Sequence, residues 1–154
     1  MSPIAWAMRP LSKYATFSGR APRPEYWWFY LLYVIVYVAA GIIGSLVGVG
    51  VQMRLLAAVA FFLPLLAAGV RRLHDTDRSG WWMLAPLLPI TIAMIMMGPA
   101  ILTGVTGSGM GIAGLVMAVG VIMAIVVLVF LVLPGTVGDN RFGPDPHCGQ
   151  PIAA

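Results

Sequence analysis

Four long runs of apolar residues dominate this sequence and constrain its fold more than any other feature. A helix needs roughly 20 apolar residues to cross the hydrocarbon core of a bilayer. Only 9% of the 154 residues are charged, against about 25% in typical soluble domains, so little polar surface is left to cover a water-soluble globule. We therefore expect an all-α, polytopic membrane protein built as a bundle of four transmembrane helices. The predicted spans cover about residues 26–51, 55–73, 81–102 and 112–133.

The polar lead before the first span contains a weaker helical pattern. Ile4, Met8, Leu11 and Ala15 fall on roughly one face of a helix. A short helix with such a face can lie in the membrane interface. Pro10 interrupts the pattern, because proline lacks the backbone N–H that an interior helical position uses. The pattern permits a short interfacial helix before the first span but does not require one.

The positive charges predict how the spans are oriented. Lys and Arg are enriched in the cytoplasmic loops of membrane proteins. Eight of the nine lie in the lead, in the loop after the second span or in the tail at residues 134–154, and only Arg54 lies in the loop after the first span. An even number of spans with both termini in the cytoplasm places those eight residues on the cytoplasmic side of the membrane. We therefore predict a single membrane domain, residues 1–154, with a cytoplasmic tail.

Proline and small residues within the spans suggest how the helices pack. Prolines imply kinks, whose freed carbonyls neighbouring groups must satisfy, and we favour packing irregularity over a hinge. Small residues in a row permit close helix contact, inside the bundle or between subunits. The prolines are Pro64, Pro86 and Pro89, and the small residues are Gly41, Gly44, Ser45 and Gly48.

Polar residues concentrate in three stretches that the predicted topology places at one membrane face. They cover residues 19–28, 71–82 and 135–146 and contain every acidic residue of the chain. Arginine is suited to bidentate pairing with carboxylate or phosphate. If the second helix continues past Val70, several of these side chains share a face, being three or four residues apart. The candidate binding residues of this cytoplasmic-face cluster are Arg20, Arg23, Glu25, Arg71, Arg72, His74, Asp75, Arg78, Trp81, Asn140, Arg141 and Asp145.

Two interpretations of this cluster compete. In the first, the residues are helix caps, a tight loop and ion pairs that orient the bundle, with Asp77 or Ser79 capping the third span. In the second, they bind an anionic lipid headgroup, a phosphorylated ligand or a protein partner. Catalysis is disfavoured, because His74 and Asp75 are neighbours on a helix and point in different directions. The chain has too few histidines, cysteines and carboxylates for a metal site, and we expect no cofactor.

The three stretches, in this order and between these spans, resemble the bacterial inner-membrane family known as domain of unknown function 805. The family pattern reads F-x-G-R-x-x-R-x-E-Y-W, R-R-L-H-D-x-x-R-S-G-W-W and G-x-x-G-x-N-x-Y-G-x-D-P. Phe142 stands where the family usually has tyrosine. The resemblance implies a small multi-helix protein of the bacterial cytoplasmic membrane and implies no activity. The matching residues are Phe17, Gly19, Arg20, Arg23, Glu25, Tyr26 and Trp27, then Arg71 to Asp75 with Arg78 to Trp82, then Gly135, Gly138, Asn140, Gly143, Asp145 and Pro146.

The sequence thus leaves three hypotheses about function. The first is a non-enzymatic membrane protein whose cluster binds anionic lipid headgroups or a protein partner. The alternative is a small transporter or channel component that forms a homo-oligomer. Against it, ionisable residues deep in a span, which usually mark ion paths, are missing. The third is an enzyme of the membrane interface. Nucleic-acid binding is excluded, because it requires a dense basic face.

Overall fold

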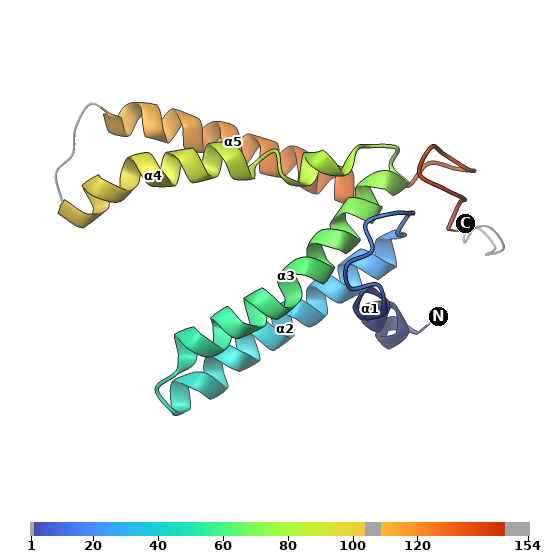
Figure 1. The fold of residues 1–154 in the computed structure, drawn as a ribbon, viewed down its shortest axis with the longest axis horizontal. Helices are drawn as coiled ribbons and strands as arrows, with labels where there is room; N and C mark the ends of the chain where they lie inside the picture. Colours follow the sequence, from blue (N-terminus) through green and yellow to red (C-terminus); the bar gives the residue numbers. More distant parts are fainter. Residues whose placement is uncertain (1, 104–108, 147–154) are drawn as a thin grey trace. The chain divides into compact units, whose positions relative to one another are not determined.

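The computed structural model describes residues 2–103 and 109–146. Over these residues the chain is helical, with no β-strand. Four helical segments are long and apolar enough to cross a membrane, which confirms the all-α fold with four spans and a short helix before them. In chain order, the elements are α1 (Pro3–Ser12), α2 (Arg23–Leu46), α3 (Gly50–Asp75), the 3-10 helix η1 (Gly80–Met83), α4 (Leu87–Thr103) and α5 (Gly109–Val132) (Figure 1).

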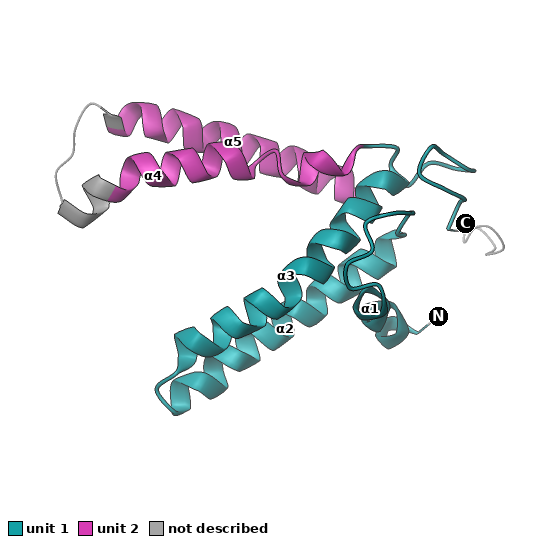
Figure 2. Cartoon of the chain, in the orientation of Figure 1, with its two compact units in different colours: residues 1–78, 134–154 teal, residues 79–133 magenta. Residues whose placement is uncertain are grey.

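Contacts divide the chain into two compact units (Figure 2). Unit 1 comprises residues 1–78 and 134–154, and unit 2 comprises residues 79–133. Each unit contains one pair of the membrane-spanning helices, α2 with α3 and α4 with α5. That the two units act as a single membrane domain stays a prediction.

In unit 1, α2 and α3 pack side by side (Figure 1). The turn between them is short and contains Gly48 with a φ of 77°, a backbone conformation that glycine adopts without strain. Just before it, a side chain at Gly44 would clash with the backbone of Gly50. Further along the pair, the ring of Phe29 stacks on Phe61 with centroids 5.5 Å apart. The small residues of α2 therefore allow close approach within the chain.

The short N-terminal helix α1 packs against both α2 and α3. Its N-terminus is capped by Ser2, whose side chain accepts a hydrogen bond from Ala5, and Pro10 lies inside the helix. Trp6 and Pro10 are buried, whereas Ile4 is 75% exposed. The proline therefore does not prevent this helix, and part of the predicted apolar face is left open on its outer side.

Unit 2 contains no charged residue. It begins with η1, and α4 follows directly after Pro86, with Pro89 in its first turn. Proline is tolerated in the first turn of a helix because the N–H there has no intrahelical partner. Gly120 lets α5 approach Ile90 of α4. Only Pro64 of the three span prolines lies in a helix interior, inside α3.

The predicted span boundaries need correction at the first loop and at the second span. The first span runs from Arg23 to Leu46 and the second begins at Gly50, so Arg54 lies in a helix and not in a loop. The second span continues to Asp75, because its last turns find partners in the lead and the tail. Residues 104–108 and the end of the predicted tail, residues 147–154, lie outside the described residues.

Candidate functional site

The last two turns of α3 carry the charged centre of unit 1. α3 continues past Val70 to Asp75, which meets the condition under which these polar side chains share a face. The side chains of Arg71 and Arg72 are 1% and 0% exposed. Although arginines near the end of a span can extend out to the headgroups, these two do not. They stay inside because buried carboxylates lie within reach, and a buried charge needs such a partner.

The carboxylate of Asp75 holds two arginines. Nε of Arg20 lies 3.0 Å from Oδ1, and Nη1 of Arg72 contacts Oδ2. All three side chains are at most 1% exposed. Arg20 arrives from the segment before α2 and Asp75 from the end of α3, so the ion pair ties the lead to the second span.

The guanidinium of Arg20 also binds the tail. Its Nη1 donates a 2.6 Å hydrogen bond to the carbonyl of Gly138, and its Nη2 donates one of 2.6 Å to the carbonyl of Thr136. The backbone N–H of Thr136 in turn donates to the carbonyl of Asp75 at 2.8 Å. One planar side chain thus joins three segments that lie far apart in the sequence.

A second buried carboxylate repeats the arrangement. Glu25 lies in the first turn of α2, where the helix dipole favours a negative charge, and it is fully buried. Nη1 of Arg71 lies 2.8 Å from its Oε1, and Nε of Arg9 in α1 lies 3.4 Å from its Oε2. Glu25 therefore connects α1, α2 and α3.

Positive charge exceeds negative charge within this core. Arg9, Arg20, Arg71 and Arg72 share the two carboxylates of Glu25 and Asp75, which gives the six side chains a net charge of +2. We call these six side chains the arginine core. Excess positive charge in a partly dehydrated setting favours an anion nearby.

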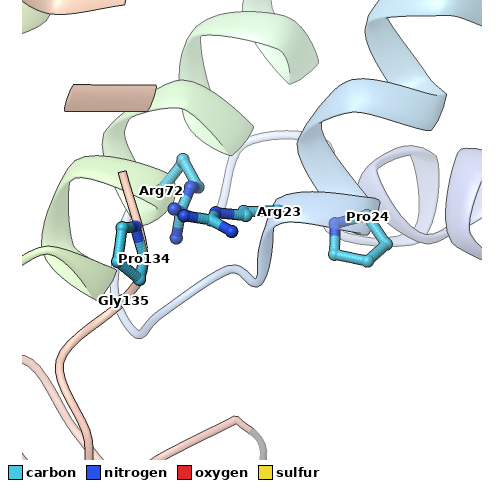
Figure 3. Close-up of a pocket in the computed structure, with 5 residues that line it drawn as sticks. All are labelled: Arg23, Pro24, Arg72, Pro134 and Gly135. Atoms are coloured by element: carbon cyan, nitrogen blue, oxygen red, sulfur yellow. The ribbon is translucent and has the colours of Figure 1, made fainter. Parts of the chain in front are cut away.

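A hollow of about 220 Å³ opens beside the arginine core. Arg23, at the first position of α2, and Arg72 both line it (Figure 3). Their guanidinium groups are close enough for their like charges to interact. The tail passes on the other side, where a side chain at Gly135 would clash with the Asp75 carboxylate. The remaining lining residues are Pro24 and Pro134.

The other predicted site residues of unit 1 mainly order the tail. The ring of His74 stacks on Phe142 with centroids 3.9 Å apart and an interplanar angle of 2°. The side-chain amide of Asn140 donates to the carbonyl of His74 at 2.9 Å. Oδ2 of Asp145 accepts a hydrogen bond from the N–H of Gly138 at 2.9 Å. These contacts hold the turn that presents its carbonyls to Arg20.

Three predicted residues are not members of the arginine core. Arg141 pairs with Asp77 at 3.1 Å, and both side chains are about half exposed or more. Arg78 donates to the carbonyl of Thr76 at 3.1 Å. Trp81 belongs to unit 2 and is 77% exposed. Whether any of the predicted residues binds a ligand stays a prediction.

Sequence reasoning missed two contributors to the site. Arg9 belongs to α1 and no motif points to it, although the helical pattern of the lead was visible. Thr136 lies inside the third polar stretch but contributes its backbone carbonyl and N–H, which every residue type except proline supplies. Gly135 was part of the third motif, and its role follows only from the contact with Asp75.

Comparison with known proteins identifies the family. The profile of a family described as a protein of unknown function, DUF805, matches residues 14–144. The chain belongs to the DUF805 family. The match covers every segment that meets in the arginine core except α1, so most of this geometry lies within the DUF805 region.

The curated relatives of this DUF805 chain are proteins of Escherichia coli. It is 36% identical to inner membrane protein YhaI of strain K12 over 148 residues, which cover 96% of this chain and 99% of the relative. It is 33% identical to inner membrane protein YhaH over 146 residues, with coverages of 92% and 95%. No solved structure matches the chain. Together with the four apolar helices, these relatives identify a multi-pass protein of the bacterial inner membrane.

Proposed function

We propose that this DUF805 protein is a non-enzymatic inner-membrane protein that binds the headgroup of an anionic lipid at its cytoplasmic face. The observation that carries the proposal is the hollow lined by Arg23 and Arg72 beside a core of net positive charge. A phosphate group there accepts hydrogen bonds from guanidinium donors, which bind phosphate in a bidentate manner.

The position of Arg23 supports an anionic occupant. Arg23 is the first residue of α2. A cation is unfavourable at a helix N-terminus, whereas an anion there is stabilised by the helix dipole and the exposed N–H groups. An anion in the hollow therefore interacts favourably with the helix end, with Arg23 and with Arg72. A lipid is favoured over a protein partner because the hollow lies at the end of two membrane-spanning helices, where headgroups lie.

The cytoplasmic orientation is part of the proposal and has its own test. It is supported by the eight Lys and Arg residues at the arginine-core end or in the tail and lead, against Arg54 alone near the opposite end of the α2–α3 pair. Val137 in the tail is 96% exposed and Val47 in that turn is 72% exposed. We expect a membrane-impermeant maleimide applied from the periplasm to label Val47→Cys and not Val137→Cys in a Cys148→Ser background. The reverse pattern would overturn the orientation.

Lipid binding is tested with purified full-length protein in nanodiscs. Native mass spectrometry compares retention of phosphatidylglycerol with that of phosphatidylcholine. We expect Arg23→Gln to weaken phosphatidylglycerol retention about tenfold, the loss typical of one charge-assisted hydrogen-bonding group. Arg141→Gln removes the same charge from an exposed pair and is the matched control. Equal retention by the two variants would overturn the lipid-binding proposal.

A further inference from the structure

Arg54 lies within the membrane-spanning part of unit 1, at the opposite end from the arginine core. It is the fifth residue of α3, about 6 Å beyond Gly50 at the rise of an α-helix. Its guanidinium lies against Gly41 of α2, where a β-carbon would clash with it. Gly41 is about 7.5 Å from the end of α2 at Leu46. The guanidinium of Arg54 therefore lies level with Gly41 and does not extend out to the turn between α2 and α3.

A hollow of about 390 Å³ opens around this arginine. Besides Arg54, its lining includes Gln52, whose side-chain amide is a hydrogen-bond donor, and Ser45, whose hydroxyl donates to the carbonyl of Gly41. The hollow also includes the first turn of α3, which has no side-chain cap and no acidic residue. The unpaired N–H groups of such a turn favour an anion. The glycines at the rim are Gly48 and Gly50.

No acidic side chain of this chain can neutralise Arg54. Within unit 1, Glu25 lies at the start of α2 and Asp75 at the end of α3, about 30 Å along the helix from Arg54. Asp77 follows α3 directly, and the tail that carries Asp139 and Asp145 is bound at that same end. Residues 79–133 of unit 2 contain no acidic residue. A counter-charge for Arg54 therefore does not come from any acidic side chain of the protein.

The surroundings of Arg54 indicate what supplies that charge. Large apolar side chains are exposed on both helices around the hollow, and in a membrane they contact acyl chains. An anion that reaches a charge at this depth is most simply one attached to an acyl chain. The exposed apolar residues are Ile42, Ile43, Leu46, Val47, Val51 and Leu55.

We propose that this hollow is a second anion site, which takes the phosphate of a phospholipid in the leaflet opposite to the arginine core. Under the orientation proposed above, this is the periplasmic leaflet. Arg54 pairs with the phosphate, Gln52 and the backbone N–H groups of the first turn of α3 offer further donors, and the acyl chains lie along the apolar surface. The site shares no residue with the hollow lined by Arg23 and Arg72.

The first test removes the charge and leaves the rest of the protein as it is. Native mass spectrometry of the full chain, released from nanodiscs containing phosphatidylglycerol, counts the lipids that stay bound. We expect Arg54→Gln to retain one lipid fewer than wild type, and to do so in an Arg23→Gln background as well. Lys13→Gln, which removes a positive charge from the lead, is the matched control. Equal lipid counts for Arg54→Gln and Lys13→Gln would overturn the proposal.

The second test identifies the source of the phosphate and does not depend on retention. In bilayers, ³¹P nuclei should dephase a guanidinium ¹⁵N signal that disappears in Arg54→Lys. Gly41→Ala, which displaces the guanidinium without changing its charge, should weaken that dephasing. Inorganic phosphate added to the bilayers should leave it unchanged. Dephasing that appears only after inorganic phosphate is added would show a free-phosphate site, and a guanidinium signal without any dephasing would show no phosphate site. Either result would overturn the proposal.

Discussion

The two ends of the α2–α3 pair treat arginine in opposite ways. At one end, four arginines share two buried carboxylates that the chain itself provides. At the other end, Arg54 has no acidic side chain of this chain within reach. The role of an arginine in this protein therefore depends on its burial and on whether a carboxylate of the chain lies within reach. The same side chain joins segments of the protein at one end and faces the lipid at the other.

The two ends also differ in how they respond to substitution. Removing one member of a buried ion pair leaves the other charge buried and uncompensated, which is strongly destabilising. Removing an arginine that faces lipid leaves no buried charge behind. We therefore expect changes at the arginine core to alter folding stability and changes at Arg54 to alter lipid retention.

The largest expected effect follows from neutralising Asp75. Asp75→Asn keeps the size of the side chain but leaves Arg20 and Arg72 without their shared carboxylate. We expect the free energy of unfolding to fall by about 3–5 kcal/mol, measured by titrating the detergent-solubilised protein with sodium dodecyl sulfate. Asp77→Asn is the matched control, because its pair with Arg141 is exposed and worth at most about 1 kcal/mol. Identical unfolding midpoints would contradict the structural role of the arginine core.

The next largest effect is expected from adding one methyl group at each end of the α2–α3 pair. In Gly135→Ala the new β-carbon meets the carboxylate of Asp75, which two arginines hold in place, so we expect a loss of about 1–3 kcal/mol. In Gly41→Ala it meets only the flexible end of Arg54, which can move aside. We expect a change below about 1 kcal/mol there, in the same titration. A larger loss for Gly41→Ala would reverse the comparison.

Shortening the reach of Arg20 should loosen the tail. Arg20→Lys keeps the charge near Asp75 but gives up the paired donors to the carbonyls of Thr136 and Gly138. We expect a loss of about 1–2 kcal/mol. Hydrogen–deuterium exchange should show faster exchange at the N–H of Thr136. With the control Arg141→Lys, exchange at Thr136 should stay as in wild type, and a similar acceleration there would argue against a specific role of Arg20.

The smallest effects concern the ring that stacks on His74. Phe142→Tyr restores the residue of the family pattern and preserves the stacked ring, so we expect a change within about 0.5 kcal/mol. Phe142→Ala removes the stacking and should lose about 0.5–1.5 kcal/mol. The same titration measures both variants. If Phe142→Tyr lost more stability than Phe142→Ala, the edge of the ring, and not its stacked face, would determine the stability of this contact.

The spans were predictable because hydrophobic length alone requires them. The gathering of the three polar stretches was predictable as well, since charge placement indicated a common face. The pairing inside the arginine core was not, because it depends on backbone carbonyls of the tail, which carry no residue-specific signal. Arg54 was assigned to a loop because a charge usually ends a predicted span. The close approach of Gly44 and Gly50 permits a short turn between α2 and α3, so α3 begins before Arg54.

The dependence of Arg20 on the tail has a consequence for how the protein is made. Thr136 follows Arg20 by 116 positions, and membrane helices leave the ribosome from the N-terminus onward. The lead and the first two spans exist before the carbonyls that Arg20 binds have been synthesised. A nascent chain that stops short of residue 134 has the carboxylate of Asp75 but lacks the tail that covers it. Completion of this buried network therefore waits for synthesis of the tail, later than synthesis of the helices that provide its carboxylates.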